Sequence, residues 1–262
     1  MGALLHPVEH GMVLRERPAA SPRGTLLLVH GLGESGLCFE GLFEAPALAD
    51  WHLLVPDLPG YGRSPWPPEP LGLAGHADHL AAWLESRGAP PVVVVGHSLG
   101  GVIALLLTER HPARVRALVD VDGNKSAADC TFSGQVAGQP LAEFRAGGFD
   151  RLRAAVHEAG RDDPAQRGYH VSLRLADPAT FHRDSRELYD LSVGETLAAR
   201  LAALPQPHRY VAGGPGGASP RSLELLRAAG VPFDVVAPSG HWPFIDQPAG
   251  FLAVLRAFLD RL

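Results

Sequence analysis

The chain has 262 residues, 46% of them hydrophobic, which is enough for one large core or for one core with an inserted cap. Its formal net charge is -5, from 23 basic and 28 acidic residues scattered along the chain, so we expect neither nucleic acid nor an anionic membrane as a partner. The N-terminus lacks a signal-peptide pattern, and no segment approaches the ~20 apolar residues of a membrane span. We therefore expect a soluble, cytoplasmic protein whose two cysteines, Cys38 and Cys130, are buried, unpaired thiols.

Strand and helix patterns alternate along most of the chain. In chain order, the residues predict a hairpin (4–8 and 12–17), a strand (25–29), a helix (38–49), a strand (53–55), a helix (73–87), a strand (92–95), a helix (98–110) and a strand (115–121). The pattern resumes with a helix (195–204), a strand (209–212), a helix (220–229), a strand (233–236) and a terminal helix (248–262). This alternation favours an α/β fold, with a mostly parallel sheet covered by helices on both faces.

The segment Gly96–Gly101 (GHSLGG) lies between the β-branched run 92–95 and an apolar helix pattern. A serine in such a sharp strand-to-helix turn needs neighbours without colliding side chains, and positions 96, 100 and 101 are all glycine. The turn also places Ser98 at a helix N-terminus, where free N–H groups stabilise a developing oxyanion. The pattern predicts that Ser98 is a catalytic nucleophile. The alternative is a glycine-rich connection with an incidental serine.

Four motifs together resemble those of the α/β-hydrolase superfamily, and the resemblance covers nearly all of the chain. They are the GHSLGG segment, His30–Gly33 (HGLG), Asp57–Ser64 (DLPGYGRS) and Ser239–Phe244 (SGHWPF). The resemblance implies a doubly wound, mostly parallel sheet and serine hydrolase chemistry. Fold and reaction class follow by analogy, whereas the mechanism depends on the individual residues.

The alternation of strands and helices stops after Asp122 for about 70 residues, which is too long for a simple connection in a compact domain. Members of the superfamily carry an inserted helical cap at this point. We therefore predict a hydrolase core formed by residues 1–124 and 195–262, and a helical cap formed by residues 125–194. The alternative is additional packing that does not contact the substrate.

A serine hydroxyl becomes a good nucleophile only when a base removes its proton, and a third group must orient that base. In hydrolases of this type the acid and then the histidine follow the serine along the chain. His241 is the only histidine after Ser98 that comes directly after the last predicted strand, and its surroundings resemble the histidine loop of the family. We predict that His241 is the general base.

The acid departs from the commonest pattern of the family, which places an aspartate after the strand at 209–212. Here the following segment, 213–219, contains no carboxylate. Haloalkane dehalogenases of the same superfamily take the acid from the strand after the nucleophile helix, and that strand ends here with Asp120 and Asp122. Alternation puts both on one face, with Asp122 nearer the carboxyl edge. We predict Asp122 as the acid and Asp120 as the reserve; the alternative is an ordinary turn.

The oxyanion hole of such enzymes consists of backbone N–H groups. We assign it to Leu32 and Leu99, with Gly33 as the alternative to Leu32. The turn at 60–62 is as consistent with a scaffold loop as with a pocket. Further candidates for the substrate pocket are Gly31, Gly33, His97, Phe132, Phe144, Tyr169 and Trp242.

Together these residues predict a cofactor-free serine hydrolase, without a metal site, that acts on a small-molecule carboxylic ester, thioester or lactone through an acyl-enzyme. Serine instead of aspartate at position 98 argues against dehalogenase and epoxide hydrolase chemistry. Two alternatives stay open: a lyase or cyclase that uses the triad as acid and base, and a catalytically silent binding protein. Neither the substrate nor the oligomeric state follows from the sequence.

Overall fold

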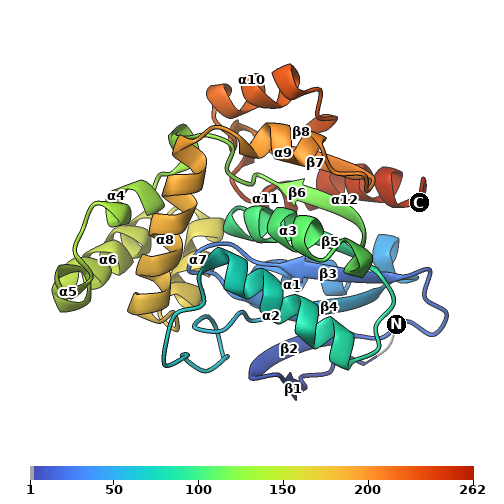
Figure 1. The fold of residues 1–262 in the computed structure, drawn as a ribbon, viewed down its shortest axis with the longest axis horizontal. Coiled ribbons are helices and arrows are strands. Elements are labelled where there is room, and N and C mark those ends of the chain that lie inside the picture. The colour runs from blue at the N-terminus through green and yellow to red at the C-terminus, as the bar shows by residue number, and fades with distance from the viewer. Residues whose placement is uncertain (1–2) are drawn as a thin grey trace.

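The computed structural model describes residues 3–262, and its centre is an eight-stranded sheet with the order β1-β2-β4-β3-β5-β6-β7-β8 (Figure 1). The pairs β1–β2 and β2–β4 are antiparallel, and all other neighbours are parallel. The strands are β1 (Val8–Glu9), β2 (Met12–Arg17), β3 (Thr25–Val29), β4 (His52–Pro56), β5 (Val92–His97), β6 (Val115–Val121), β7 (His208–Gly216) and β8 (Phe233–Gly240).

Helices cover both faces of this sheet. Figure 1 shows α2 (Gly72–Ser86) and α3 (Leu99–Arg110) side by side in front of the strands, and α12 (Pro248–Leu259) behind them. Strand β5 lies at the centre with all of its residues buried, which explains its uninterrupted valine run. Helix α3 is buried from Leu99 to Thr108, as its apolar pattern predicts. The predicted α/β class with a mostly parallel sheet is confirmed.

Eight helical segments follow one another between β6 and β7 in the described residues, and most of them gather at the end of the sheet where α3 begins (Figure 1). Asp163 and Asp177 accept backbone N–H groups at the starts of α7 and α8, and each is followed by a proline at the first helical position. The division into a core and a cap at residues 125–194 stays a prediction. The segments are the 3-10 helix η4 (Ala127–Asp129), α4 (Ser133–Ala137), α5 (Leu141–Glu143), the π-helical η5 (Phe144–Gly148), α6 (Phe149–Ala159), α7 (Pro164–Leu173), α8 (Pro178–Val193) and α9 (Leu197–Ala202).

The single helix predicted at 38–49 is wrong. The chain forms a 3-10 turn, η1 (Gly36–Phe39), then α1 (Glu40–Phe43), then a second 3-10 turn, η2 (Pro46–Leu48). Pro46 cannot continue a helix, and it holds Ala45 in an extended conformation.

Other boundaries differ at the ends of elements. The first strand of the predicted hairpin shrinks to β1, because Pro7 has no N–H to donate to a ladder. Strands β7 and β8 run past their predicted ends and pair as far as Gly216 and Gly240. Helix α10 (Pro220–Ala229) matches its predicted range, and a short helix, α11 (Pro243–Asp246), precedes α12.

Both cysteines are free thiols, but only Cys130 is buried, since Cys38 is partly exposed. Among the helices of residues 3–262, none is long and apolar enough to cross a membrane.

Candidate active site

Ser98 is the single residue between the end of β5 and the start of α3, and its φ is 54° with ψ at -122°. This is an unfavourable backbone conformation for a residue with a side chain, and it persists only where the surroundings enforce it. A Cβ at position 96 would overlap the carbonyl of Gly100, and one at position 100 would overlap the carbonyl of Val29. A Cβ at position 101 would overlap the Asp120 carboxylate. Glycine is therefore required at these three positions, because neighbouring backbone or carboxylate atoms lie too close to leave room for a Cβ.

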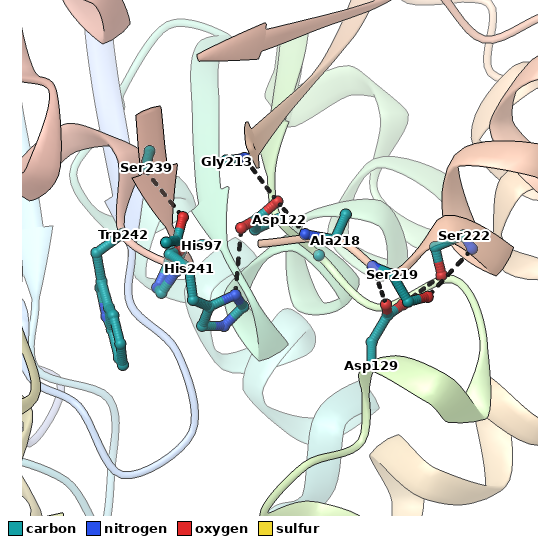
Figure 2. A network of polar contacts seen from close by, with 12 residues as sticks. His97, Asp122, Asp129, Gly213, Ala218, Ser219, Ser222, Ser239, His241 and Trp242 are labelled. Carbon is teal, nitrogen blue, oxygen red and sulfur yellow. Dashed lines mark hydrogen bonds and ion pairs between the residues drawn. The ribbon is translucent and has the colours of Figure 1, made fainter. Parts of the chain in front are cut away.

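Asp122 and His241 meet at the carboxyl ends of β6 and β8 (Figure 2). Asp122 Oδ2 lies 3.3 Å from His241 Nδ1. Asp122 Oδ1 accepts the backbone N–H groups of Gly213 and Ala218, each at 3.1 Å. One carboxylate oxygen is thus held by two backbone donors, and the other faces the imidazole. The Asp122 side chain is fully buried, whereas the His241 side chain is 35% exposed.

Asp120, the reserve acid, has different partners. Its carboxylate forms a buried ion pair with Lys125 Nζ at 2.7 Å and accepts the N–H of Gly123 at 3.0 Å. Burial raises the pKa of Asp120, and the Lys125 charge only partly opposes this. The alternation argument that put both aspartates on one face does not describe Asp122. Strand β6 ends at Val121 and Asp122 has a φ of 48°, which turns its side chain out of the strand pattern.

The segment 213–219, which lacks the carboxylate that the family commonly has there, wraps around Asp122 instead. A Cβ at Gly217 would overlap Asp122 Oδ2. Asp129 anchors the far end of this segment, because its carboxylate accepts the N–H of Ser219 at 3.0 Å and the hydroxyl of Ser222 (Figure 2). Glycine at position 217 leaves room for the carboxylate that comes from β6.

Ser98 and His241 line one cavity of about 280 Å³, into which the helical segments after β6 also project. No hydrogen bond joins these two side chains within the described residues. The other lining residues are Leu32, Glu34, Asp122, Asn124, Ala128, Asp129, Thr131, Phe132, Ser133, Gln166, Tyr169, Leu188, Gly216, Gly217, Ala218 and Trp242.

Backbone N–H groups at two segments border this cavity. The N–H of Gly31 donates to Glu34 Oε2 at 2.6 Å, so it is already occupied. Among residues 3–262, neither the N–H of Leu32 nor that of Leu99 has a protein acceptor. Leu99 is the first residue of α3, where the helix leaves its N–H groups free.

Three of the predicted pocket residues, Phe132, Tyr169 and Trp242, line the cavity and form a row of stacked or tilted rings. The other four, Gly31, Gly33, His97 and Phe144, do not line it.

The packing of these four residues explains why they do not line the cavity. Phe144 packs in the core against Phe149 and Phe181. Gly33, with a φ of 72°, lies against Phe181, while Gly31 lies between Glu34 and the Cβ of Ser98. His97 is fully buried between Glu34 and the backbone of His241.

The turn at 60–62 belongs to the scaffold. Tyr61 is fully buried, and its hydroxyl donates to Asp184 at 2.6 Å. Sequence reasoning missed Glu34, Asp129 and Gln166 in the cavity wall. Only Glu34 carried a signal, as the residue that directly follows the HGLG motif. Within the described part of the chain, no group of three or more histidine, cysteine, aspartate or glutamate side chains could hold a metal ion.

Comparison with known families agrees with this geometry. A family model described as alpha/beta hydrolase fold matches residues 24–161, just over half of the chain. The chain belongs to the alpha/beta hydrolase fold family. The resemblance found in the sequence and the prediction of an enzyme with this fold are thereby confirmed.

Two curated relatives illustrate the range of similarity. The pimeloyl-[acyl-carrier protein] methyl ester esterase of Neisseria meningitidis is 29% identical over 255 residues, which cover 89% of this chain and 92% of that protein. Lipase LipV of Mycobacterium tuberculosis is 40% identical over 107 residues, 41% of this chain and 40% of the lipase.

Solved structures share the fold over the whole chain. The enol-lactonase of Burkholderia xenovorans LB400 has a TM-score of 0.78 at 17% identity and covers 98% of this chain and 100% of its own. A thermophilic esterase of Thermogutta terrifontis has a TM-score of 0.77 at 20% identity and covers 99% of both chains.

Proposed function

We propose that this alpha/beta hydrolase is a serine hydrolase that cleaves a small, uncharged carboxylic ester, thioester or lactone through an acyl-enzyme. The observation that carries the proposal is the contact between Asp122 and His241 at the wall of the cavity that Ser98 also lines. A nucleophile, a base and an orienting carboxylate, which follow β5, β8 and β6 at the same edge of the sheet, are the parts that acyl transfer needs. The esterase and lipase relatives support the same reaction class.

In this mechanism Ser98 Oγ attacks the acyl carbon while His241 Nε2 takes its proton. Asp122 holds the Nδ1–H tautomer of His241 and stabilises the imidazolium that forms. The N–H groups of Leu32 and Leu99 bind the negative oxygen of the tetrahedral intermediate. His241 then gives the proton to the leaving alcohol or thiol. A water molecule, activated by the same histidine, releases the acid from Ser98.

The size and charge of the cavity support a small, uncharged substrate. Its volume of about 280 Å³ is roughly twice that of a ~150 Å³ cavity that holds one benzene, so on the order of a dozen non-hydrogen atoms can enter. The wall contains the carboxylates Glu34, Asp122 and Asp129 but neither lysine nor arginine. The Glu34 carboxylate is paired with His97, but Asp122 and Asp129 would repel a substrate carboxylate there, because the wall offers no lysine or arginine to bind it.

Two assays test this proposal. The first is labelling with a fluorophosphonate followed by mass spectrometry, in which we expect modification at Ser98. The second compares kcat/KM for p-nitrophenyl esters of acetate, butanoate, octanoate and dodecanoate, and for the mono-p-nitrophenyl ester of glutarate. We expect butanoate to be favoured over dodecanoate and over the negatively charged glutarate ester, each by about tenfold or more, the charge effect being on the order of 1 to 2 kcal/mol.

The matched control is Ser192→Ala, since Ser192 is buried in α8, donates to the carbonyl of Leu188 and lies outside the cavity wall. Ser98→Ala should abolish both labelling and turnover, whereas Ser192→Ala should keep both. Turnover that survives in folded Ser98→Ala would overturn the proposed mechanism. Equal rates for the butanoate and glutarate esters would overturn the proposed charge preference.

A further inference from the structure

Glu34 in the cavity wall and His97 behind it form a buried pair, with side chains 3% and 0% exposed. Glu34 Oε2 lies 3.0 Å from His97 Nδ1. The two residues are 63 positions apart in the chain: Glu34 lies in the loop after β3, and His97 is the last residue of β5, both at the carboxyl edge of the sheet. The mechanism above assigns no proton transfer to either of them, yet both adjoin groups that it uses.

The contacts of the pair define its protonation. His97 Nε2 lies 2.8 Å from the carbonyl oxygen of His241, and a carbonyl can only accept, so this nitrogen carries a hydrogen. The Glu34 carboxylate accepts the N–H of Gly31 at 2.6 Å and the indole N–H of Trp242, and these donors stabilise its charged form. With the carboxylate ionised, His97 Nδ1 is also a donor. The pair is therefore an imidazolium against a carboxylate.

The pKa shifts of the two residues agree with a protonated His97 and an ionised Glu34. Burial raises the pKa of Glu34, but the charge of His97 and the hydrogen bonds more than reverse this and lower it to about 2. Burial lowers the pKa of His97, but the Glu34 charge and hydrogen bond raise it above its ordinary value. The groups that face the His97 ring are Glu34, His241, Trp242 and Phe244, with the more distant charge of Asp122 acting in the same direction as Glu34.

Each contact of the pair lies within one residue of a group that the proposed mechanism uses. Gly31 precedes Leu32, whose N–H is assigned to the oxyanion hole. His97 precedes Ser98, and its Nε2–H binds the backbone of His241 itself. Trp242 follows His241 and donates to Glu34. Three loops that are far apart in the sequence therefore meet at one carboxylate and one imidazolium.

We propose that Glu34 and His97 are positioning residues. As a charged pair, they hold the loop of Leu32, the turn of Ser98 and the loop of His241 in the relative positions that catalysis requires. This inference rests on the proposed serine hydrolase function. When His97 loses a proton at alkaline pH, one ring nitrogen is left with a lone pair that faces an acceptor oxygen, either the Glu34 carboxylate or the His241 carbonyl, and that contact becomes repulsive. The proposal thus predicts an alkaline decline of kcat that originates outside the Asp122–His241 couple.

The test compares Glu34→Gln, His97→Gln and the double variant with the wild type, using p-nitrophenyl butanoate. We expect each single variant to lose about 10- to 100-fold in kcat with KM nearly unchanged, because reacting groups are misplaced without loss of binding surface. The double variant should be no worse than the worse single one, since the two residues act as a unit. Glu34→Gln should also lose the alkaline decline of kcat, because no carboxylate then faces His97.

A second buried pair provides the matched control. His76 Nε2 lies 3.0 Å from Asp184 Oδ2, both side chains are fully buried, and neither residue lines the cavity. Asp184→Asn should lower the melting temperature and leave the kcat profile against pH as in the wild type. If Glu34→Gln shares that behaviour, with wild-type kcat and the same alkaline decline, the pair is structural only and the proposal is wrong.

A measurement on the wild-type protein covers the case in which a variant does not fold. Nitrogen NMR of the His97 ring should report both nitrogens protonated at pH 6.5, where an ordinary histidine is half neutral, and a neutral ring would overturn the proposal. This readout needs no substrate. A wild-type protein that neither reacts with fluorophosphonate nor cleaves esters would refute the proposed function, whereas an active wild type with a neutral His97 refutes only the pairing.

Discussion

Replacing Asp122 by asparagine changes one atom of the carboxylate, and the structure predicts which way the new amide turns. Asp122 Oδ1 accepts two backbone N–H groups, from Gly213 and Ala218, so the amide oxygen must stay there. The amide NH₂ then takes the place of Oδ2 and faces His241 Nδ1. It donates to that nitrogen and thereby favours the tautomer of His241 with its hydrogen on Nε2, which cannot accept the proton of Ser98.

We expect kcat of Asp122→Asn to fall by roughly ten-thousand-fold, the loss seen for the equivalent change in serine proteases, which corresponds to about 5 kcal/mol of transition-state stabilisation. The assay is steady-state turnover of p-nitrophenyl butanoate, with circular dichroism to show that the variant is folded. KM should change little, because the acid does not touch the substrate.

Asp120→Asn is the contrasting variant. It leaves Lys125 buried without its partner, so it should cost about 3 to 5 kcal/mol of unfolding free energy while the folded fraction keeps most of its activity. Near-normal turnover of Asp122→Asn together with loss of activity in folded Asp120→Asn would refute the reasoning and exchange the roles of the two aspartates.

Three further predictions follow from the same site. Ser98→Ala and His241→Ala should each cost on the order of a million-fold in kcat, with the double variant little worse, and losses that multiply would show that one of them is outside the triad. Gly217→Ala places a methyl group where Asp122 Oδ2 lies and should lower kcat about a hundred-fold, whereas Gly138→Ala, with open space around it, should have no effect, as steady-state kinetics of both will show. The folded pKa of Glu34, about 2, lies below its ordinary value of 4.5, so its stabilisation of about 3 kcal/mol is present above pH 4.5 and is lost as the pH falls through about 2. Urea unfolding of wild type and Glu34→Gln at pH 7 and pH 3 should therefore give a stability difference that shrinks in acid, and an equal difference at both pH values would contradict it.

The sequence by itself determined the features whose signals are local. Ser98 could be recognised because a β-branched strand, a turn with glycines at fixed offsets and an apolar helix are consecutive in the chain. The alternation of strand and helix patterns likewise predicted the parallel sheet, and His241 followed from chain order. The local predictions that were wrong concern element boundaries, such as the helix predicted at 38–49, which Pro46 divides, and the strands β7 and β8, which are longer than predicted.

The tertiary structure alone decided which groups meet. The sequence alone does not distinguish the roles of Asp120 and Asp122. Their roles differ because Lys125 forms an ion pair with Asp120, whereas the positive φ of Asp122 turns its side chain toward His241. His97 is a pocket candidate by position, yet it is buried because Glu34, 63 residues away, closes over it. Contacts between residues 63 to 119 positions apart depend on how strands order themselves in the sheet, and no pattern in a single segment records that order.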